Sequence, residues 1–114
     1  GFKVGQRRRW SFNMAKTAQT SLMKNLALKH DLARAGITFN SVAPGAVMIP
    51  DTGWEAEREK DAAAFATMVD REFPLGRLGT PDEVAYVVAM VCAEHATLLT
   101  GAALAVDGCE TRSF

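Results

Sequence analysis

The fold of this chain is decided by residues 12–45, which read FNMAKTAQTSLMKNLALKHDLARAGITFNSVAPG. Apolar residues at helical spacing predict a helix from residue 12 to about residue 35, and Gly36 is the stop expected just past a helix end. Residues 37–43 alternate with β-branched and aromatic residues and predict a strand, which a Pro-Gly pair ends. A helix that enters a strand through one glycine is half of a βαβ unit. We therefore expect this strand to lie in a parallel sheet.

Three further elements follow along the chain. Residues 54–73 are rich in good helix formers and predict a helix within a long connection, where α/β folds place lids over substrates. An amphipathic helix packed for stability alone explains this pattern equally well. Residues 80–83, Thr-Pro-Asp-Glu, form a capping box and predict a helix that runs to about residue 94. Residues 102–106 predict a short strand, which the turn at residues 107–108 closes.

The composition is that of one soluble domain with a modest core, since the 114 residues are 48% apolar and 23% charged. The formal net charge is zero, so no global field favours nucleic acid or an anionic membrane. Two cysteines, Cys92 and Cys109, match neither a disulfide framework nor a zinc spacing and indicate free thiols. The sequence shows no membrane span and no apolar stretch of a signal peptide. We expect a cytoplasmic protein with no nucleic-acid or membrane partner.

Residues 1–11 differ in character from residues 12–114, which form the expected domain. Residues 6–10 read QRRRW, with neither strand alternation nor an apolar helix face, and predict a basic, partly ordered arm. Arg7, Arg8 and Arg9 with the following tryptophan also suit a phosphate-binding patch that stacks on a base. A solvated tail is the better explanation of this composition.

Four motifs occur in a fixed order along the chain. They are Phe-x-x-x-Lys at 12–16, GITFNSVAPG at 36–45, PLGRLGTPDEVA at 74–85 and TGAALAVDG at 100–108. Together they resemble the C-terminal half of a short-chain dehydrogenase/reductase, and the resemblance covers residues 12–109. It implies an α/β, partial Rossmann-like fold, helix-rich with a few parallel strands, which oligomerisation completes.

The resemblance also implies a chemistry and a set of site residues. The family moves hydride between a nicotinamide cofactor, NAD(P)H, and a carbonyl or alcohol. A tyrosine at the position of Phe12 donates the proton, and a lysine at the position of Lys16 lowers the pKa of that tyrosine and holds the nicotinamide ribose. The turn at Pro44 and Gly45, with Val47 beyond it, lies along the nicotinamide.

Several positions depart from the family pattern. Phe12 has no proton to donate, and the loss of a positioned general acid typically costs about 10² to 10⁴ in rate. The family's serine lies about twelve residues before the tyrosine, so Ser11 is too close to replace it. The glycine-rich turn that binds the pyrophosphate in the family is missing from the 114 residues. Ile49 stands where many members have a threonine, for which Thr52 is a candidate replacement, and Cys109 stands where a glycine is usual.

Other candidate sites are weaker. His30 and His95 have no acid or cysteine at ligand spacing, so solvated or capping histidines are expected, and no metal site is predicted. Four carboxylates offer a paired-carboxylate site, but basic residues between them indicate a solvated helix face: Asp51, Glu55, Glu57 and Glu59.

Two functions from different classes follow from these observations. The first is a truncated family member without ordinary dehydrogenase activity, which acts as an oligomerising or partner-binding module. The second is an NAD(P)H-dependent oxidoreductase, in which another chain supplies the missing half or Lys16 and water replace the tyrosine. The first is favoured, with weak or absent NAD(P)H binding by the isolated chain. A homodimer or higher homo-oligomer is expected, since unpaired strand edges and wide apolar helix faces need a cover.

Overall fold

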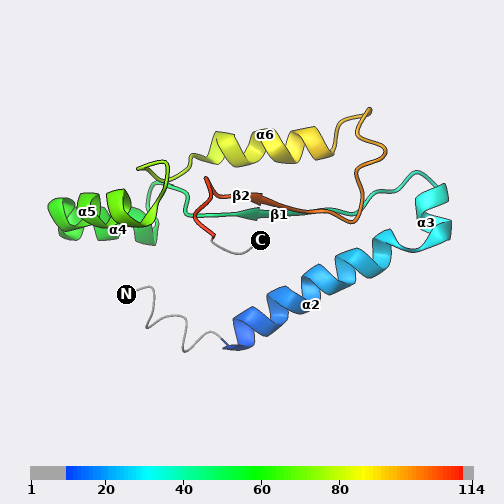
Figure 1. Ribbon diagram of the computed structural model, residues 1–114, viewed down its shortest axis with the longest axis horizontal. Coiled ribbons are helices and arrows are strands. Elements are labelled where there is room, and N and C mark those ends of the chain that lie inside the picture. The colour runs from blue at the N-terminus through cyan, green and yellow to red at the C-terminus, as the bar shows by residue number, and fades with distance from the viewer. Residues whose placement is uncertain (1–9, 112–114) are drawn as a thin grey trace. The chain divides into compact units, whose positions relative to one another are not determined.

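Two compact units make up the chain in this computed structural model, which describes residues 10–111. Unit 1 consists of the residues up to Ser41 together with Thr97–Ala103, and unit 2 consists of Val42–Ala96 together with the residues from Leu104 onward. Helices predominate, with one small sheet (Figure 1). No helix within residues 10–111 has both the length and the hydropathy that crossing a membrane requires. The predicted arginine patch at residues 7–9 lies outside the described residues.

Unit 1 begins with two helices where the sequence predicts one. Helix α2 (Trp10–Ala27) starts two residues before the expected position, and α3 (His30–Arg34) follows after a break. The prediction of an uninterrupted helix is wrong because Lys29 takes an extended backbone conformation, with φ −75° and ψ 116°. The break contains neither proline nor glycine, so helix propensity gives no sign of it. The chain leaves α3 as predicted, through Gly36 at φ 82°.

The strand predicted at residues 37–43 is shorter and later in the structure, where β1 spans Ser41–Pro44. Side-chain hydrogen bonds, together with one backbone bond from the Gly101 N–H to the Phe39 carbonyl at 2.6 Å, hold the residues just before β1. The Asn40 side-chain amide donates to the Leu99 carbonyl at 2.9 Å, and its oxygen accepts from the Ala102 N–H at 3.1 Å. The Phe39 N–H donates to the Thr100 hydroxyl at 3.1 Å. The 37–43 prediction is therefore corrected: residues 39 and 40 pair with residues 99–102 through backbone and side-chain groups together, which strand propensity does not anticipate.

The second strand, β2 (Ala103–Val106), pairs with β1 and begins one residue later than predicted. The Ser41 N–H donates to the Ala102 carbonyl at 2.9 Å, and the Gly45 N–H donates to the Val106 carbonyl at 3.1 Å. The residue offset is the same at both ends of the pair, so the strands run parallel, as predicted.

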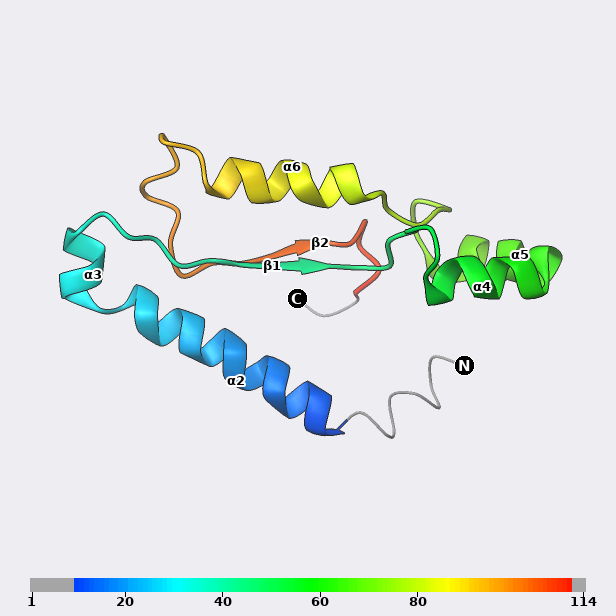
Figure 2. The same cartoon turned by 180° about the vertical axis from the view of Figure 1, so that it is seen from behind.

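Unit 2 contains a helical hairpin where one helix is predicted over residues 54–73. Helices α4 (Gly53–Lys60) and α5 (Ala62–Glu72) run side by side (Figures 1 and 2). The single-helix prediction is wrong because Asp61 adopts an extended backbone at φ −158° and its carboxylate accepts from the Ala64 N–H at 3.1 Å. Aspartate is a strong N-cap residue, so it starts a new helix at this point.

The core of unit 2 lies between this hairpin and the loops beside it. Val69, Phe73 and Leu78 are buried, and Trp54 packs edge-on against Phe65 and Phe73, with ring centroids 6.4 and 6.2 Å apart. Such edge-to-face contacts add to the area that the rings bury. Within the described part of unit 1, Met23 is the buried apolar side chain. The described part of each unit therefore has a small core, in which even the most buried apolar side chains keep some exposure.

Helix α6 (Pro81–Val91) carries the predicted capping box. The Thr80 hydroxyl accepts from the Glu83 N–H at 3.3 Å, and the Glu83 carboxylate accepts from the Thr80 N–H at 3.0 Å. Arg77 adds a two-point contact to the same carboxylate, at 2.8 and 3.0 Å. The sequence predicts one apolar face formed by Val84, Val87, Val88 and Val91; Val84, Val87 and Val91 are half-buried, whereas Val88 is exposed. The helix ends about three residues before the expected position.

This cap makes a pH-dependent contribution to folding. The guanidinium of Arg77, followed by the Thr80 N–H, lowers the pKa of Glu83 from its ordinary 4.5 to about 2. Because the folded pKa is the lower one, the stabilisation is complete above the unfolded pKa and is lost as the pH falls from 4.5 to about 2. We expect the melting temperature of the wild type to fall more over this range than that of Glu83→Gln. Glu94→Gln, which changes a glutamate outside the cap, is the control, and equal pH profiles for the wild type and Glu83→Gln would refute the linkage.

Candidate functional site

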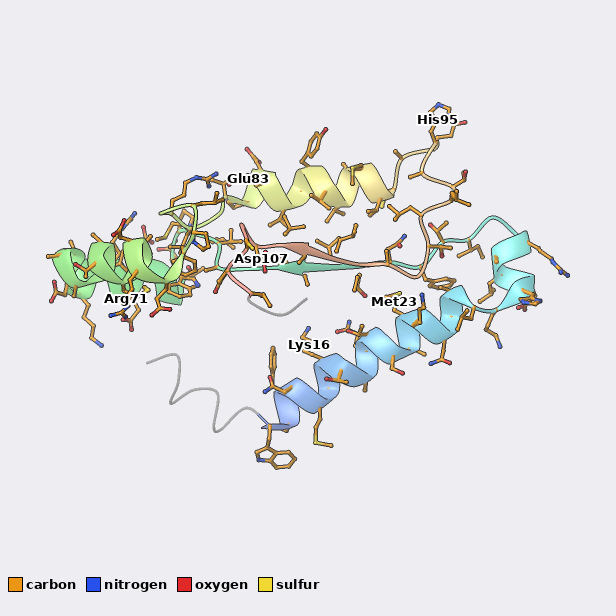
Figure 3. The ribbon with its side chains drawn as sticks, in the orientation of Figure 1. Lys16, Met23, Arg71, Glu83, His95 and Asp107 are labelled. Carbon is orange, nitrogen blue, oxygen red and sulfur yellow. The ribbon has the colours of Figure 1, made fainter. Side chains whose placement is uncertain are left out.

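Phe12 and Lys16 lie one turn apart on α2, in unit 1 (Figure 3 labels Lys16). The Lys16 ammonium is 5.6 Å from the centroid of the Phe12 ring, within the range of a cation–π contact, and its Nζ lies 3.4 Å from the Gln19 side-chain oxygen. The four-residue spacing thus brings the two side chains together as predicted. The lysine faces a ring that carries no ionisable hydroxyl.

Pro44, Gly45 and Val47 lie together on the wall of an open pocket of about 510 Å³ in unit 2. We call this the turn pocket; its wall is completed by Ile49, Thr52, Trp54, Pro81 and Val84. The lining is apolar except for the Thr52 hydroxyl, the Trp54 indole N–H and the backbone, and it contains no charged side chain. An apolar wall with few polar groups suits a flat ring better than a phosphate.

Backbone pairing places the start of α6 beside the turn. Val47 and Gly79 form an isolated parallel bridge, in which the Met48 N–H donates to the Gly79 carbonyl at 3.0 Å. The Gly79 N–H donates to the Ala46 carbonyl at 2.9 Å. This bridge carries Pro81 and Val84 to the pocket. Sequence reasoning missed these two residues and Trp54, because a bridge between distant segments leaves no periodic signal.

Ile49 and Thr52 both line the turn pocket. Thr52 therefore lies close to the position where many family members have a threonine, as a replacement would have to. The Thr52 hydroxyl donates to the Ile49 carbonyl at 2.6 Å. This bond lies within the loop 49–52, and the Thr52 hydroxyl oxygen can still accept a hydrogen bond.

The residues after β2 pack against the turn from the other side. The Glu110 carboxylate accepts from the Ala46 N–H at 2.9 Å. The Asp107 carboxylate accepts from the N–H groups of Cys109 and Thr111 at 3.0 and 3.2 Å. The Thr111 side chain, followed by these N–H groups, lowers the pKa of Asp107. Cys109 has φ 66°, a conformation that favours glycine, which explains why glycine is usual there in the family.

The remaining candidates are not among the residues that line the turn pocket. His30 begins α3, and His95 follows α6 in an exposed loop (Figure 3). The Glu55 carboxylate accepts from the Asp51 N–H at 2.6 Å and lies 3.6 Å from Arg58. Both of these partners are within four residues of Glu55, at the start of α4. Residues 10–111 contain no group of three or more histidines, cysteines or acids placed to hold a metal. Cys92 is a free, exposed thiol, and so is the Cys109 thiol.

Comparison with known proteins gives consistent matches over most of the chain. Residues 2–109 match the family model described as enoyl-(acyl carrier protein) reductase. The chain is 40% identical over 97 residues to the uncharacterized oxidoreductase YmfI of Bacillus subtilis, covering 85% of this chain and 37% of that protein. It is 39% identical over 105 residues to cis-4-hydroxycyclohexanecarboxylate dehydrogenase of Sinomonas cyclohexanicum, covering 92% and 39%.

Solved structures agree with these matches. The crystal structure of YwfH, an NADPH-dependent reductase involved in bacilysin biosynthesis, matches with a TM-score of 0.76 and 26% identity, covering 89% of this chain and 39% of YwfH. A putative oxidoreductase from Escherichia coli matches with a TM-score of 0.64 and 34% identity, covering 89% and 34%. The chain therefore spans between 34% and 39% of the length of these proteins.

Proposed function

This chain belongs to the short-chain dehydrogenase/reductase family, and we propose that it lacks the family's ordinary dehydrogenase activity and acts as an oligomerising or partner-binding module. The proposed loss of dehydrogenase activity rests on one observation. Phe12 occupies the position of the family tyrosine beside Lys16, and its ring has no proton to transfer. The chain's one tyrosine, Tyr86, lies on α6 in unit 2 and is 74% exposed, so it belongs to a different element from Lys16.

Exposed apolar side chains support the second part of the proposal. Helix α2 exposes more than half of four large apolar side chains: Trp10, Phe12, Met14 and Leu22. The sheet formed by the described residues has two strands, and each leaves one edge without a neighbouring strand. A second copy of the chain is the proposed cover, since closed two-fold symmetry is the commonest arrangement of homo-oligomers.

A second candidate function is that of an NAD(P)H-dependent oxidoreductase whose nucleotide-binding half comes from another chain. The turn pocket favours it, because Pro44, Gly45 and Val47 line one apolar wall. These residues fit a nicotinamide ring, which would supply hydride when bound. The positive charge of Lys16 would suit a ribose hydroxyl or a developing oxyanion.

Cofactor titration separates the two functions. We expect the purified 114-residue chain to bind NADPH and NADH weakly, with dissociation constants above the micromolar range. Affinity in this fold depends largely on a pyrophosphate at a glycine-rich helix N-terminus, and no such loop occurs within these residues. Calorimetry or cofactor fluorescence measures the constant. A micromolar value for either cofactor would favour the oxidoreductase over the module.

Light scattering coupled to size exclusion tests the oligomer. We expect twice the 12.3 kDa chain mass at low micromolar concentration, with an interface of about 2,000 Å² or more. Leu22→Lys, on the exposed apolar part of α2, should shift the equilibrium toward monomer, while Thr20→Lys on the same helix is the matched control. A well-folded wild-type monomer would contradict the module.

A further inference from the structure

The turn pocket depends on a carboxylate that sequence reasoning did not identify. Glu110 lies after β2, 64 residues along the chain from Ala46, and its Oε2 accepts from the Ala46 N–H at 2.9 Å. Both residues are half-buried in unit 2. A hydrogen bond to an ionised acceptor is stronger than one between neutral groups. Glu110 therefore tethers the backbone immediately after the turn.

The packing beneath the tether leaves no room for a side chain. A Cβ placed on Gly45 would lie 2.6 Å from Glu110 Oε2, 2.7 Å from the Asp107 Cβ and 2.9 Å from the Asp107 Cα. Atoms do not approach this closely, so glycine is required for the contact. The Gly45 backbone thus lies directly against Asp107 and the Glu110 carboxylate.

The chain reverses tightly over residues 107–110, and this turn places Glu110 beside Ala46. Gly108 and Cys109 both adopt positive φ, at 58° and 66°. The Glu110 N–H donates to the Asp107 carbonyl at 3.0 Å, and the Asp107 carboxylate accepts from Cys109 and Thr111. The reversal is held by bonds within the segment, so it presents the Glu110 carboxylate in one place.

We propose that Glu110 is a positioning residue for the turn pocket, and that it sets the wall against which a planar nicotinamide-type ring binds. The backbone of Ala46 is held at both of its polar groups, by Glu110 at its N–H and by the Gly79 N–H at its carbonyl. Pro44 and Gly45 precede this residue, and Val47 follows it, in the pocket wall. Gly79 lies two residues before α6, which supplies Pro81 and Val84, so one residue links both walls.

The inference rests on the second candidate function, in which this pocket receives the ring. Its first test is independent of any ligand. In Glu110→Ala the Ala46 amide should exchange its hydrogen about 10- to 100-fold faster by NMR, the loss expected for a bond to a charged acceptor. Glu110→Gln keeps an oxygen acceptor and should change the rate much less. Glu94→Ala, a glutamate outside the segment, should leave it unchanged.

The second test measures whether the loss of Glu110 changes the wall of the turn pocket. Trp54 lines the pocket and is the only tryptophan left after Trp10→Phe, so its quenching by acrylamide reports access to the wall. In that background Glu110→Ala should increase quenching and weaken binding of reduced nicotinamide mononucleotide, with an unchanged far-UV circular dichroism spectrum. If Glu110→Ala does not fold, Glu110→Asp retains the charge, falls short by one methylene and should show the same responses.

The outcomes separate the two proposals. Unchanged Ala46 exchange and unchanged Trp54 quenching in folded Glu110 variants would overturn the positioning role. Faster exchange without any change in Trp54 quenching would also overturn it, because Glu110 would then be a structural tether alone. Absence of binding of reduced nicotinamide mononucleotide by the wild type would refute the turn pocket as a ring site of this chain, while exchange and quenching still decide whether Glu110 shapes the wall.

Discussion

Gly45→Ala is expected to lower the free energy of unfolding by about 2–3 kcal/mol, as overpacking at a closed contact does. The added methyl would overlap Glu110 and Asp107 at distances below 3 Å, and one of the atoms it meets is the Asp107 Cα, which cannot move without the strand end. In a chain whose described residues bury few side chains completely, this loss is a large part of the total stability. Urea unfolding followed by circular dichroism measures it.

Gly53→Ala is the matched control for this substitution. No atom lies within 4 Å of a Cβ at Gly53, its φ is not positive, and it begins α4, where alanine is favourable. Its stability should equal or exceed that of the wild type. Gly45→Ala combined with Glu110→Ala should remain destabilised, because the contact with Asp107 persists. Equal urea midpoints for Gly45→Ala and Gly53→Ala would show that the turn and the segment 107–111 are not in close contact.

Phe12→Tyr is expected to raise carbonyl reduction by about 10²- to 10⁴-fold, but only in a preparation that already binds the cofactor. The new hydroxyl would lie on the face of α2 that carries Lys16, whose ammonium now sits 5.6 Å from the ring centroid. A nearby cation favours the ionised phenol and so lowers its pKa. Oxidation of NADPH in the presence of a carbonyl substrate measures the gain.

The control for this change is the double variant Phe12→Tyr with Lys16→Met. It retains the phenol and removes the cation, so most of the gain should disappear if the pair acts together. The isolated chain should show no gain from Phe12→Tyr alone, because it binds the cofactor weakly. Reduction by the isolated single variant would mean that the loss of cofactor affinity had been overestimated.

The sequence alone determined the elements whose causes are local. The capping box at Thr80 and Glu83 predicted the start of α6 correctly, since each partner lies three residues from the other. The apolar run that ends at Val106 predicted β2 to within one residue. The spacing of Phe12 and Lys16 placed them on one helix face, and the Pro-Gly turn was correctly expected to end β1. These features depend on residues within a turn or two of each other.

Only the tertiary structure decided the features that depend on distant segments. The Asn40 side chain bonds to Leu99 and Ala102, which lie 59 and 62 residues further along the chain, at a position predicted to belong to a strand ladder. The turn pocket needs the bridge between Val47 and Gly79, and its wall needs Glu110. No periodicity or propensity encodes a contact across 30 or 60 residues, because such a contact acquires its energy only when both segments are already folded.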